Sequence, residues 1–584
     1  MGSPCNVSGS ASQLFFQNKS CAEYRALSII AESLAHPQRT LLSAFVQHAV
    51  DREIASQFFL DEVSGQDTVA VSEFLADWIC LLKKVRPVVC TDLKETLRQN
   101  IWQRDGGRCC VSKAEKEKQF DGGLLLAYVL SPSFFCDSDM VNNERLSSIF
   151  AAFIGESQLQ NLRSLMGQDS LSPDRDQSDR LVLLSTRIFE HFRNGRLSLK
   201  RSSSVAAGDS ARFFVESRNF IPSIHVDTFH FITLENNAVG LASLPNTQLL
   251  EMHHRCAEAL AWLEVLEYMK RNPNTLHRPS SREFANAAMK TPANKSFWNL
   301  WYLQAIPDAF RYVWVQTPAF FRAFAYKRLA RISNRLYGRT GSDRIYRLPF
   351  NLYLRVASSD WAPKHQAEAQ SLRLIEKYTH VPAPRAIDAI QYSDSSFLLM
   401  TGIPGEIIGR MISTMTDEQL HSVARDLKKY IAEMRQIPNN TGSRFQICNA
   451  LGGGILDWRI GESQRRELRF QDETQFNEYL TEDLPLDEDA RKLASKSHGV
   501  KHDIVFTHGD LNLRNILVDG NGKISGIVDW ECAGWYPEYW EYTKAHFSAR
   551  YSIRWTADVI DQDFLGYRDE LRVEDMLSSM APSW

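Results

Sequence analysis

The pattern of hydrophobic and polar residues gives its clearest helical signal between residues 416 and 438. Thr416 and Gln419 have the spacing of a capping box, which satisfies free N–H groups at the start of a helix. Pro438 ends the pattern, because proline lacks a backbone donor and fixes φ. Between them apolar residues recur at intervals of three and four, at Leu420, Val423, Ala424, Leu427, Ile431 and Met434. This spacing predicts one amphipathic helix.

Strand patterns precede this helix. Residues 344–356 contain two β-rich runs, and residues 349–351 between them predict a turn. Residues 364–378 form a helical pattern that stops at the prolines of HVPAPR. Residues 396–406 predict a buried strand that ends at Pro-Gly. This order predicts an α+β arrangement, in which a small sheet-rich lobe is followed by a larger helical lobe.

One change in composition divides the 584 residues, a length that suits several domains. Residues 271–295 are rich in proline, asparagine, serine and charge, which predicts a linker. The linker separates two N-terminal segments from a C-terminal domain at residues 296–584. The first N-terminal segment, residues 1–89, is expected to be a helical extension, and the second comprises residues 90–270. We therefore expect a separate, mostly helical N-terminal domain.

Charge and cysteine content argue against several functions. The net charge is -3, so general attraction to nucleic acid is not expected. The 10 cysteines are scattered without CxxC spacing, which favours neither a zinc knuckle nor a disulfide framework. No apolar run approaches the length of a membrane span, and the N-terminus lacks the pattern of a secretory signal. We expect a reduced, cytoplasmic protein with neither nucleic acid nor membrane as partner.

Three polar residues at fixed spacing stand beside short β-branched runs near the C-terminus. Asp510 and Asn515 lie on one predicted loop, and Asp529 follows the next predicted strand. Residues 519–522, Asp-Gly-Asn-Gly, have the chemistry of a hairpin turn. This arrangement can bring the three side chains to one point.

Phosphoryl transfer from a nucleotide uses these residue types. A carboxylate orients and deprotonates the acceptor hydroxyl, and hard oxygen ligands hold Mg²⁺ against the phosphates. Asp510 suits the first role, whereas Asn515 and Asp529 suit the second. The spacing H-x-D-x-x-x-x-N from His508, with an Asp on the next strand, is that of kinase catalytic residues. The alternative is that these side chains only satisfy backbone groups at strand ends.

Four segments carry a resemblance to a known family. THGDLNLRNILVD and GIVDWECAGWYPEYWEY closely resemble the aminoglycoside phosphotransferase, or choline-kinase-like, family, and look most like its fungal members. EAQSLRLIEKYTHVPAPR and LMTGIPGE appear in the family's order, so the resemblance covers roughly residues 300–575. It implies a two-lobed protein-kinase-like fold that moves the γ-phosphate of ATP onto a small-molecule hydroxyl.

The resemblance also implies roles for individual residues. Asp510 would be the catalytic base, and Asn515 and Asp529 would be the Mg²⁺ ligands. His508 would brace the catalytic loop. The hinge that meets adenine through its backbone would be Met400, Thr401, Gly402 and Ile403.

One position departs from the family pattern. The family usually has lysine at the end of the third strand of the first lobe, where this chain has Arg355, opposite Glu368. Arginine is a planar fork and lysine a compact point charge, so the exchange is not conservative at a phosphate. The alternative for Arg355 and Glu368 is a surface ion pair. Gly338 and Gly341 only weakly indicate a loop over the phosphates, and a plain turn is an equal expectation.

Acids and aromatic residues follow the metal-binding strand, where a substrate cleft would open. Glu531, Trp535, Tyr536 and Glu538 would suit a cationic or aromatic acceptor. The alternative is that the aromatic residues of this segment pack the helical lobe and cap its helices.

The N-terminal half carries a second, partial resemblance. Residues 97–117 resemble the entry to a fungal HNH-nuclease-like domain, which often opens RDGGRC. The resemblance places Tyr128 and Phe189 where such nucleases have histidines, and His191 two residues beyond the second. A metal-dependent nuclease needs an imidazole base and metal ligands. Residues 90–270 are therefore predicted to be a degenerate domain of this type that does not cleave nucleic acid.

The leading hypothesis is an ATP- and Mg²⁺-dependent phosphotransferase acting on a hydroxyl of a small molecule. The fungal resemblance suggests a secondary metabolite as that molecule. The alternative is a catalytically weak or inactive kinase-like protein that binds nucleotide or acts as a scaffold. Arg355 and the degenerate N-terminal domain motivate this alternative.

Overall fold

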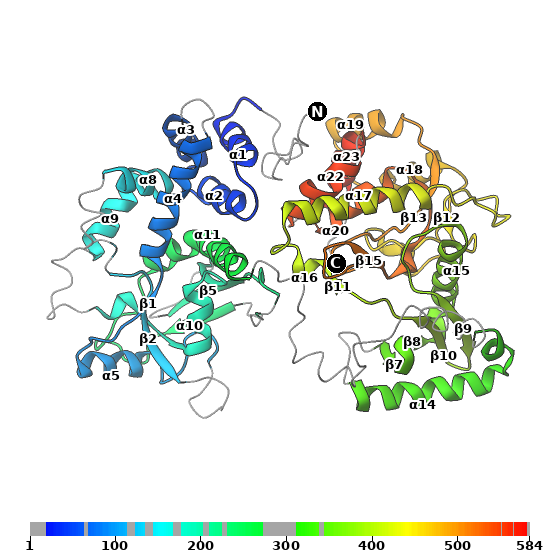
Figure 1. Cartoon of the computed structure of the whole chain (residues 1–584), viewed down its shortest axis with the longest axis horizontal. Helices are drawn as coiled ribbons and strands as arrows, with labels where there is room; N and C mark the ends of the chain where they lie inside the picture. Colours follow the sequence, from blue (N-terminus) through cyan, green and yellow to red (C-terminus); the bar gives the residue numbers. More distant parts are fainter. Residues whose placement is uncertain are drawn as a thin grey trace. The chain divides into compact units, whose positions relative to one another are not determined.

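The computed structural model of the chain divides into two compact units (Figure 1). The N-terminal unit is Met1–Pro273 with Arg410–Asp417, and the C-terminal unit is Asn274–Gly409 with Glu418–Trp584. The residues described are 19–580, apart from 64–67, 114–122, 133, 135–143, 167–176, 203–209, 223, 225–230, 273–310, 338–343, 550–551 and 565. Most of the predicted linker lies outside them, as do Gly338 and Gly341.

The N-terminal unit consists of helices and two small antiparallel sheets. Its helices are α1 (Ala22–Ser33), α2 (Gln38–Gln47), α3 (Arg52–Glu62), α4 (Thr68–Val85), α5 (Glu95–Arg104), α8 (Glu144–Ile154), α9 (Glu156–Met166), α10 (Thr186–Arg193) and α11 (Thr247–Arg271). One sheet has the order β1-β2-β3, from Val88–Val89, Leu124–Tyr128 and Leu181–Ser185. The other has the order β4-β5-β6, from Leu197–Arg201, Ser210–Ser217 and Phe231–Glu235.

A large hydrophobic core extends through much of the N-terminal unit. Phe45 on α2 packs its ring against those of Phe74, Trp78 and Phe153. The same cluster of buried side chains continues to Leu266 on α11. The first four helices therefore share their core with the segment that follows residue 90.

The first lobe of the C-terminal unit is a helix-flanked sheet. The antiparallel sheet has the order β7-β8-β10-β9, from Ile345–Leu348, Leu352–Ser358, Ser395–Thr401 and Ala386–Tyr392. α14 (Ala319–Tyr337) lies along it (Figure 1), and α15 (Ala362–Tyr378) follows β8 and packs on β9 and β10. Side chains of α14 and of the strands form one cluster, so burial of the sheet holds the helix in place.

The second lobe is larger and mainly helical. Its helices include α17 (Asp417–Met434), α18 (Glu473–Thr481), α19 (Glu488–His498), α20 (Trp540–Ala549) and α23 (Arg568–Met580), and the short α16 (Ile408–Met411) begins in this unit. One three-stranded sheet has the order β11-β14-β15, from Glu406–Ile407, Ile516–Val518 and Ile524–Ile527. The other has the order β12-β16-β13, from Cys448–Asn449, Gly534–Pro537 and Ile504–Thr507.

Most elements predicted for the C-terminal half are confirmed. The helical pattern at 364–378 is α15, and the apolar positions predicted after residue 416 are the buried residues of α17. Residues 349–351 form the turn between β7 and β8. In the part of the chain that the structure describes, no helix is both long and apolar enough to cross a bilayer.

Candidate functional site

The strands that flank the candidate loop belong to two different sheets. β13 pairs with β16, whereas β14 pairs with β15 and β11. The loop 508–515 therefore crosses from one sheet to the other. β13 is an edge strand with one partner, whereas β14 lies between two partner strands, so each end of the loop is anchored in its own sheet.

His508 is held in one tautomer by its hydrogen bonds. Its Nδ1 accepts from the backbone N–H of Asp510 at 3.2 Å, so Nε2 carries the proton and donates to the carbonyl of Val528 at 3.0 Å. Burial lowers the pKa of His508, which keeps the ring neutral. A neutral imidazole thus links the loop to the end of β15, as a brace would.

Glu541 on α20 fixes the start of the same loop. Its carboxylate accepts from the backbone N–H of His508 at 2.6 Å and of Gly509 at 3.2 Å. Burial raises the pKa of Glu541 to about 7, although these two donors lower it. Gly509 has φ +75°, and a Cβ there would lie 2.7 Å from the carbonyl oxygen of Cys532. The loop requires glycine at this position.

Asp510 and Asn515 are hydrogen-bonded to each other. Nδ2 of Asn515 donates to the backbone carbonyl and to Oδ2 of Asp510, both at 2.9 Å. Because an amide is planar, this turns Oδ1 of Asn515 away from Asp510. The carboxylate of Asp510 is thus held in place, and Oδ1 of Asn515 is an oxygen that could serve as a metal ligand.

Arg355 on β8 joins three carboxylates. Its Nη1 lies 3.3 Å from Oε2 of Glu368 on α15 and 3.0 Å from Oε2 of Glu531. Its Nη2 pairs with Oδ1 of Asp529. The Glu368 side chain is 1% exposed, so this pair is buried and is not the surface ion pair of the alternative interpretation. The structure brings Arg355, Glu368 and Asp529 together from distant parts of the chain.

Three carboxylates share one guanidinium, so the cluster has an excess of negative charge. Burial would lower the pKa of Arg355, but the charges of Glu368, Asp529 and Glu531 raise it. Burial raises the pKa of Glu368 to about 8 despite Arg355, with Asp529 and Glu531 adding to the shift. Burial and Asp529 raise the pKa of Glu531 as well. A divalent cation would relieve this excess.

Asp529 has a left-handed backbone conformation and a partly exposed side chain. It has φ 70° and ψ 61°, the left-handed region that aspartate tolerates better than most residues. Its side chain is 34% exposed. The carboxylate is therefore the member of the cluster that a ligand from solvent can reach most easily.

The first two residues of the predicted hinge, Met400 and Thr401, are the last residues of β10 and pair with β8. The other two, Gly402 and Ile403, follow the strand. The N–H of Gly402 donates to the carbonyl of Asn351 at 2.6 Å, and its carbonyl accepts from Asn351 Nδ2 at 2.8 Å. The backbone N–H of Ile403 has no hydrogen-bond partner within the described residues. Ile403 is thus the hinge residue whose N–H can meet a nucleobase.

Trp535 and Tyr536 on β16 are core residues. They are 2% and 1% exposed. The Trp535 ring meets that of Phe506 edge to face at 5.1 Å, and the Tyr536 ring stacks on Trp540 at 6.0 Å. These contacts support the alternative that Trp535 and Tyr536 pack the helical lobe.

The two acids proposed for substrate binding have partners. Glu531 is engaged by Arg355. Glu538 accepts from the Tyr567 hydroxyl at 2.7 Å and lies 3.6 Å from Nη1 of Arg435. Both carboxylates are therefore already engaged by protein side chains, which does not favour a role in substrate binding.

A buried ion-pair network in the second lobe has no sequence signal. Nζ of Lys544 lies 2.9 Å from Oδ1 of Asp457, and both side chains are 1% exposed. Arg459 lies between Asp457 and Glu574, 3.8 and 3.3 Å from their oxygens. Burial would raise the pKa of Asp457, but Lys544 and Arg459 lower it. The network ties α20 and α23 to the segment after β12.

The positions singled out by the nuclease resemblance lie in the N-terminal unit. Tyr128 on β2 donates to Oε1 of Gln177 at 3.4 Å, and Phe189 on α10 is buried. Nδ1 of His191 lies 3.0 Å from Nη1 of Arg196. The described residues contain no group of three or more His, Cys, Asp or Glu side chains that could hold a metal ion.

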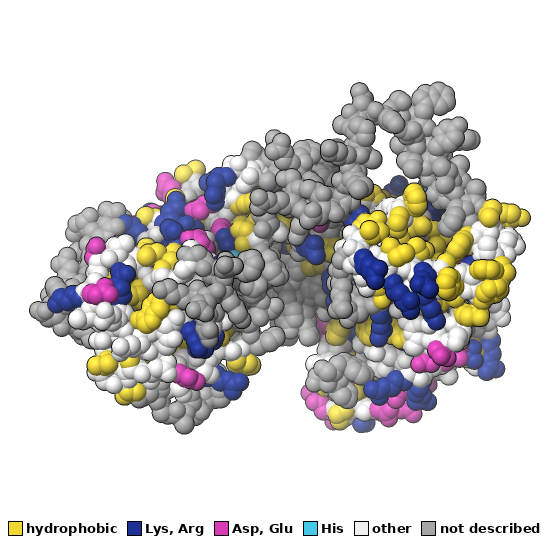
Figure 2. Space-filling model, turned by 90° about the horizontal axis from the view of Figure 1, so that it is seen from below, with side chains coloured by type: hydrophobic (Ala, Val, Ile, Leu, Met, Phe, Trp, Pro, Cys, Tyr) yellow, Lys and Arg dark blue, Asp and Glu magenta, His cyan; other side chains and the backbone are white. Residues whose placement is uncertain are grey.

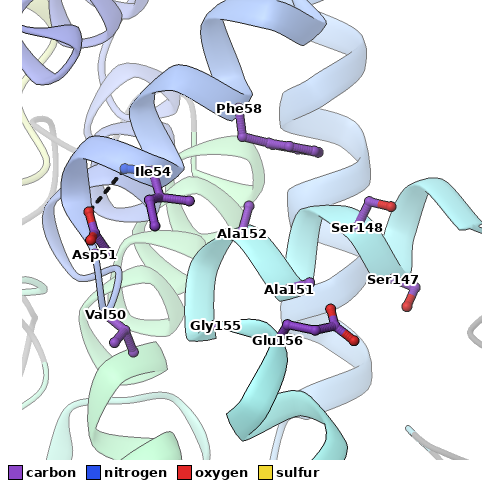
Figure 3. Close-up of a pocket in the computed structure, with 10 residues that line it drawn as sticks. All are labelled: Val50, Asp51, Ile54, Phe58, Ser147, Ser148, Ala151, Ala152, Gly155 and Glu156. Atoms are coloured by element: carbon purple, nitrogen blue, oxygen red, sulfur yellow. Dashed lines mark hydrogen bonds between the residues drawn. The ribbon is translucent and has the colours of Figure 1, made fainter.

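A cavity of about 420 Å³ opens between α3 and α8 of this unit (Figure 3). Its lining includes Val50, Ile54 and Phe58 together with Ala151 and Ala152 on the facing helix. Asp51 caps α3 by accepting from two backbone N–H groups at 3.0 Å. The rest of the lining is Ser147, Ser148, Gly155 and Glu156, which do not form a set of the kind found around Asp510, and the candidate site is that of the C-terminal unit.

Comparison with known proteins bears on this unit. No curated protein sequence matches the chain. Among solved structures, an aminoglycoside phosphotransferase from Streptomyces rimosus in complex with ADP and streptomycin is 15% identical, with 44% of this chain and 98% of that one covered and a TM-score of 0.30. A macrolide 2'-phosphotransferase from Brachybacterium faecium is 16% identical, with 40% and 78% covered and a TM-score of 0.27. A putative fructosamine-3-kinase from Haemophilus somnus is 12% identical, with 39% and 74% covered and a TM-score of 0.28.

The family comparison identifies the same region. Residues 326–576 match the model of the phosphotransferase enzyme family. This segment contains β8, the hinge, the loop at 508–515 and Asp529. The match confirms the predicted resemblance to this family for the C-terminal region.

Proposed function

We propose that the C-terminal unit is an ATP- and Mg²⁺-dependent phosphotransferase that acts on a hydroxyl of a small molecule. The observation that carries the proposal is that the Asp510–Asn515 pair lies beside the Arg355–Asp529 pair, because the backbone N–H of Val528 donates to the carbonyl of Asn515 at 2.9 Å. The family match over residues 326–576 supports the same class of reaction. The resemblance to fungal members suggests a secondary metabolite as the acceptor, and free thiols at the described cysteines fit a reduced, cytoplasmic setting.

Each residue has a role that its contacts support. Asp510 orients the acceptor hydroxyl and takes its proton, while Asn515 holds that carboxylate in place. Oδ1 of Asn515 and the carboxylate of Asp529 would hold Mg²⁺, a cation that prefers oxygen ligands and keeps places for phosphates. When bound, the metal neutralises charge on the phosphates. The excess negative charge around Arg355 fits a divalent cation at this position.

The test compares two Asp→Asn variants in the full chain. The assay follows transfer of the labelled γ-phosphate of ATP to a panel of small-molecule hydroxyl compounds. Asp510→Asn is expected to lose at least about 100-fold in rate, the usual share of a general base. Asp519→Asn, in the turn between β14 and β15, is the matched control and is expected to keep the rate. Transfer that persists at the wild-type rate in Asp510→Asn would contradict the proposal.

A second candidate is a protein that binds nucleotide without turnover. It is favoured by one observation, the ion pair in which Arg355 engages the metal-binding carboxylate of Asp529. Mg²⁺ would have to compete with the guanidinium for that oxygen. Calorimetry that shows nucleotide binding, together with no transfer to any acceptor, would select this candidate. A gain of transfer in Arg355→Lys would identify the arginine as the cause, because lysine lacks the second arm of the fork.

A further inference from the structure

α14 is fixed on the sheet by one face only. Ala323, Tyr326, Ala330 and Ser333 are its buried residues, at the spacing of a single helix face. The Tyr326 hydroxyl donates to Oδ2 of Asp388 on β9 at 2.6 Å. These contacts set the rotation of the helix, so its opposite face is turned to solvent.

The outer face of α14 carries large apolar side chains. Phe320, Phe321 and Phe324 in its first two turns are 48%, 59% and 60% exposed, and Leu336 in its last turn is 60% exposed. Natural proteins rarely leave a contiguous group of such side chains in water without a use. Figure 2 shows hydrophobic and basic side chains gathered on the side of this unit that carries α14.

The charge on the same helix has one sign. Residues 319–337 contain five Lys or Arg and no Asp or Glu. Arg322 is neutralised by Asp388. The remaining four form no ion pair with any described residue, and they are Lys327, Arg328, Arg331 and Arg335. A helix of 19 residues thus presents a strip of cations and apolar groups about 28 Å long.

We propose that the outer face of α14 docks on an anionic lipid surface. Phenylalanine rings suit the boundary between headgroups and acyl chains, and unpaired cations suit anionic headgroups. The helix would lie in the plane of the interface and would not cross it, which agrees with the lack of a described helix able to span a bilayer.

The experiment is co-sedimentation of the full chain with vesicles of phosphatidylcholine, alone or mixed with phosphatidylserine. Binding is expected only with phosphatidylserine, and it should weaken as salt is added. The triple variant Lys327→Gln/Arg331→Gln/Arg335→Gln should lose about fivefold in affinity per cation, on the order of 100-fold in all. The variant Phe321→Ser/Phe324→Ser should also bind less, because its apolar contacts are removed.

The matched control removes the same charge elsewhere in the C-terminal unit. Lys428→Gln/Lys492→Gln/Lys501→Gln changes three exposed lysines and should bind vesicles as the wild type does. Equal losses in the two triple variants would overturn the proposal, since general charge would then explain binding. Absence of sedimentation with either vesicle would also overturn it. A dimer in gel filtration that dissociates in Phe321→Ser/Phe324→Ser, without vesicle binding, would assign this face to a second copy of the chain.

Discussion

Arg355→Met removes the guanidinium that three carboxylates share. Glu368 is 1% and Glu531 13% exposed, so both would be left buried without their cationic partner. Breaking a buried pair in this way costs about 3–5 kcal/mol in free energy of unfolding. For a unit of this size the midpoint of thermal unfolding falls by about 2–4 °C per kcal/mol, which gives about 6–20 °C.

The effect should depend on pH and on metal. Loss of Arg355 raises the pKa of Glu368 beyond the value of about 8 that it has in the wild type. Because a carboxyl with a raised native pKa binds a proton that the unfolded chain releases, stability falls as pH rises. The variant should therefore lose more stability at pH 8 than at pH 6. Millimolar Mg²⁺ should restore part of the loss, since a cation would again face the acids.

Differential scanning calorimetry in EDTA and in Mg²⁺ measures both effects. Arg385→Met is the control, because Arg385 pairs with Glu376 at a more exposed place, with side chains 37% and 25% exposed. Loss of such a surface pair costs about 0–1 kcal/mol. Equal midpoints for Arg355→Met and the wild type in EDTA would refute the view that Arg355 neutralises a buried acid cluster.

Three further changes test the contacts that surround the site. Glu541→Gln removes a carboxyl whose native pKa is about 7 against an ordinary 4.5. The free energy of unfolding of the variant should therefore fall less between pH 4.5 and pH 7 than that of the wild type, by up to about 1.4 kcal/mol per pH unit. Urea titrations at several pH values measure this difference, and equal slopes for variant and wild type would contradict it. Lys544→Met leaves Asp457 buried without its closest cation, so the free energy of unfolding should fall by about 3–5 kcal/mol, measured by urea titration at pH 7. A fall of less than about 1 kcal/mol would show that Lys544 does not compensate the charge of Asp457. Gly509→Ala places a Cβ 2.7 Å from the carbonyl oxygen of Cys532, so phosphotransfer should fall at least about tenfold, as it does when catalytic geometry is displaced; an unchanged rate would mean that the loop tolerates the shift.

Local patterns in the sequence predicted the elements of the C-terminal unit. The buried positions of α17 follow from helical spacing alone, and the turn at 349–351 follows from its residue types. Asp510 and Asn515 were predicted to lie together because they are five positions apart on one loop. These features depend on neighbours in the chain, which sequence patterns describe.

Contacts between distant segments could not be predicted in the same way. Arg355 meets Asp529 across 174 positions, and no periodicity links β8 to the end of β15. The sequence pattern did not indicate that β13 and β14 belong to different sheets, because both segments have the pattern of short apolar strands. The role of Glu541 could not be predicted either, because the backbone N–H of His508 that it accepts from lies 33 positions earlier in the chain.

Calorimetric titration of the full chain with ATP, with and without Mg²⁺, tests the central claim most directly. Binding to the wild type should require Mg²⁺ and should weaken at least about tenfold in Asp529→Asn, because one charged metal ligand is lost. Binding that is the same with and without Mg²⁺, or no heat of binding at millimolar ATP, would contradict the assignment of Asn515 and Asp529 to a magnesium–nucleotide site.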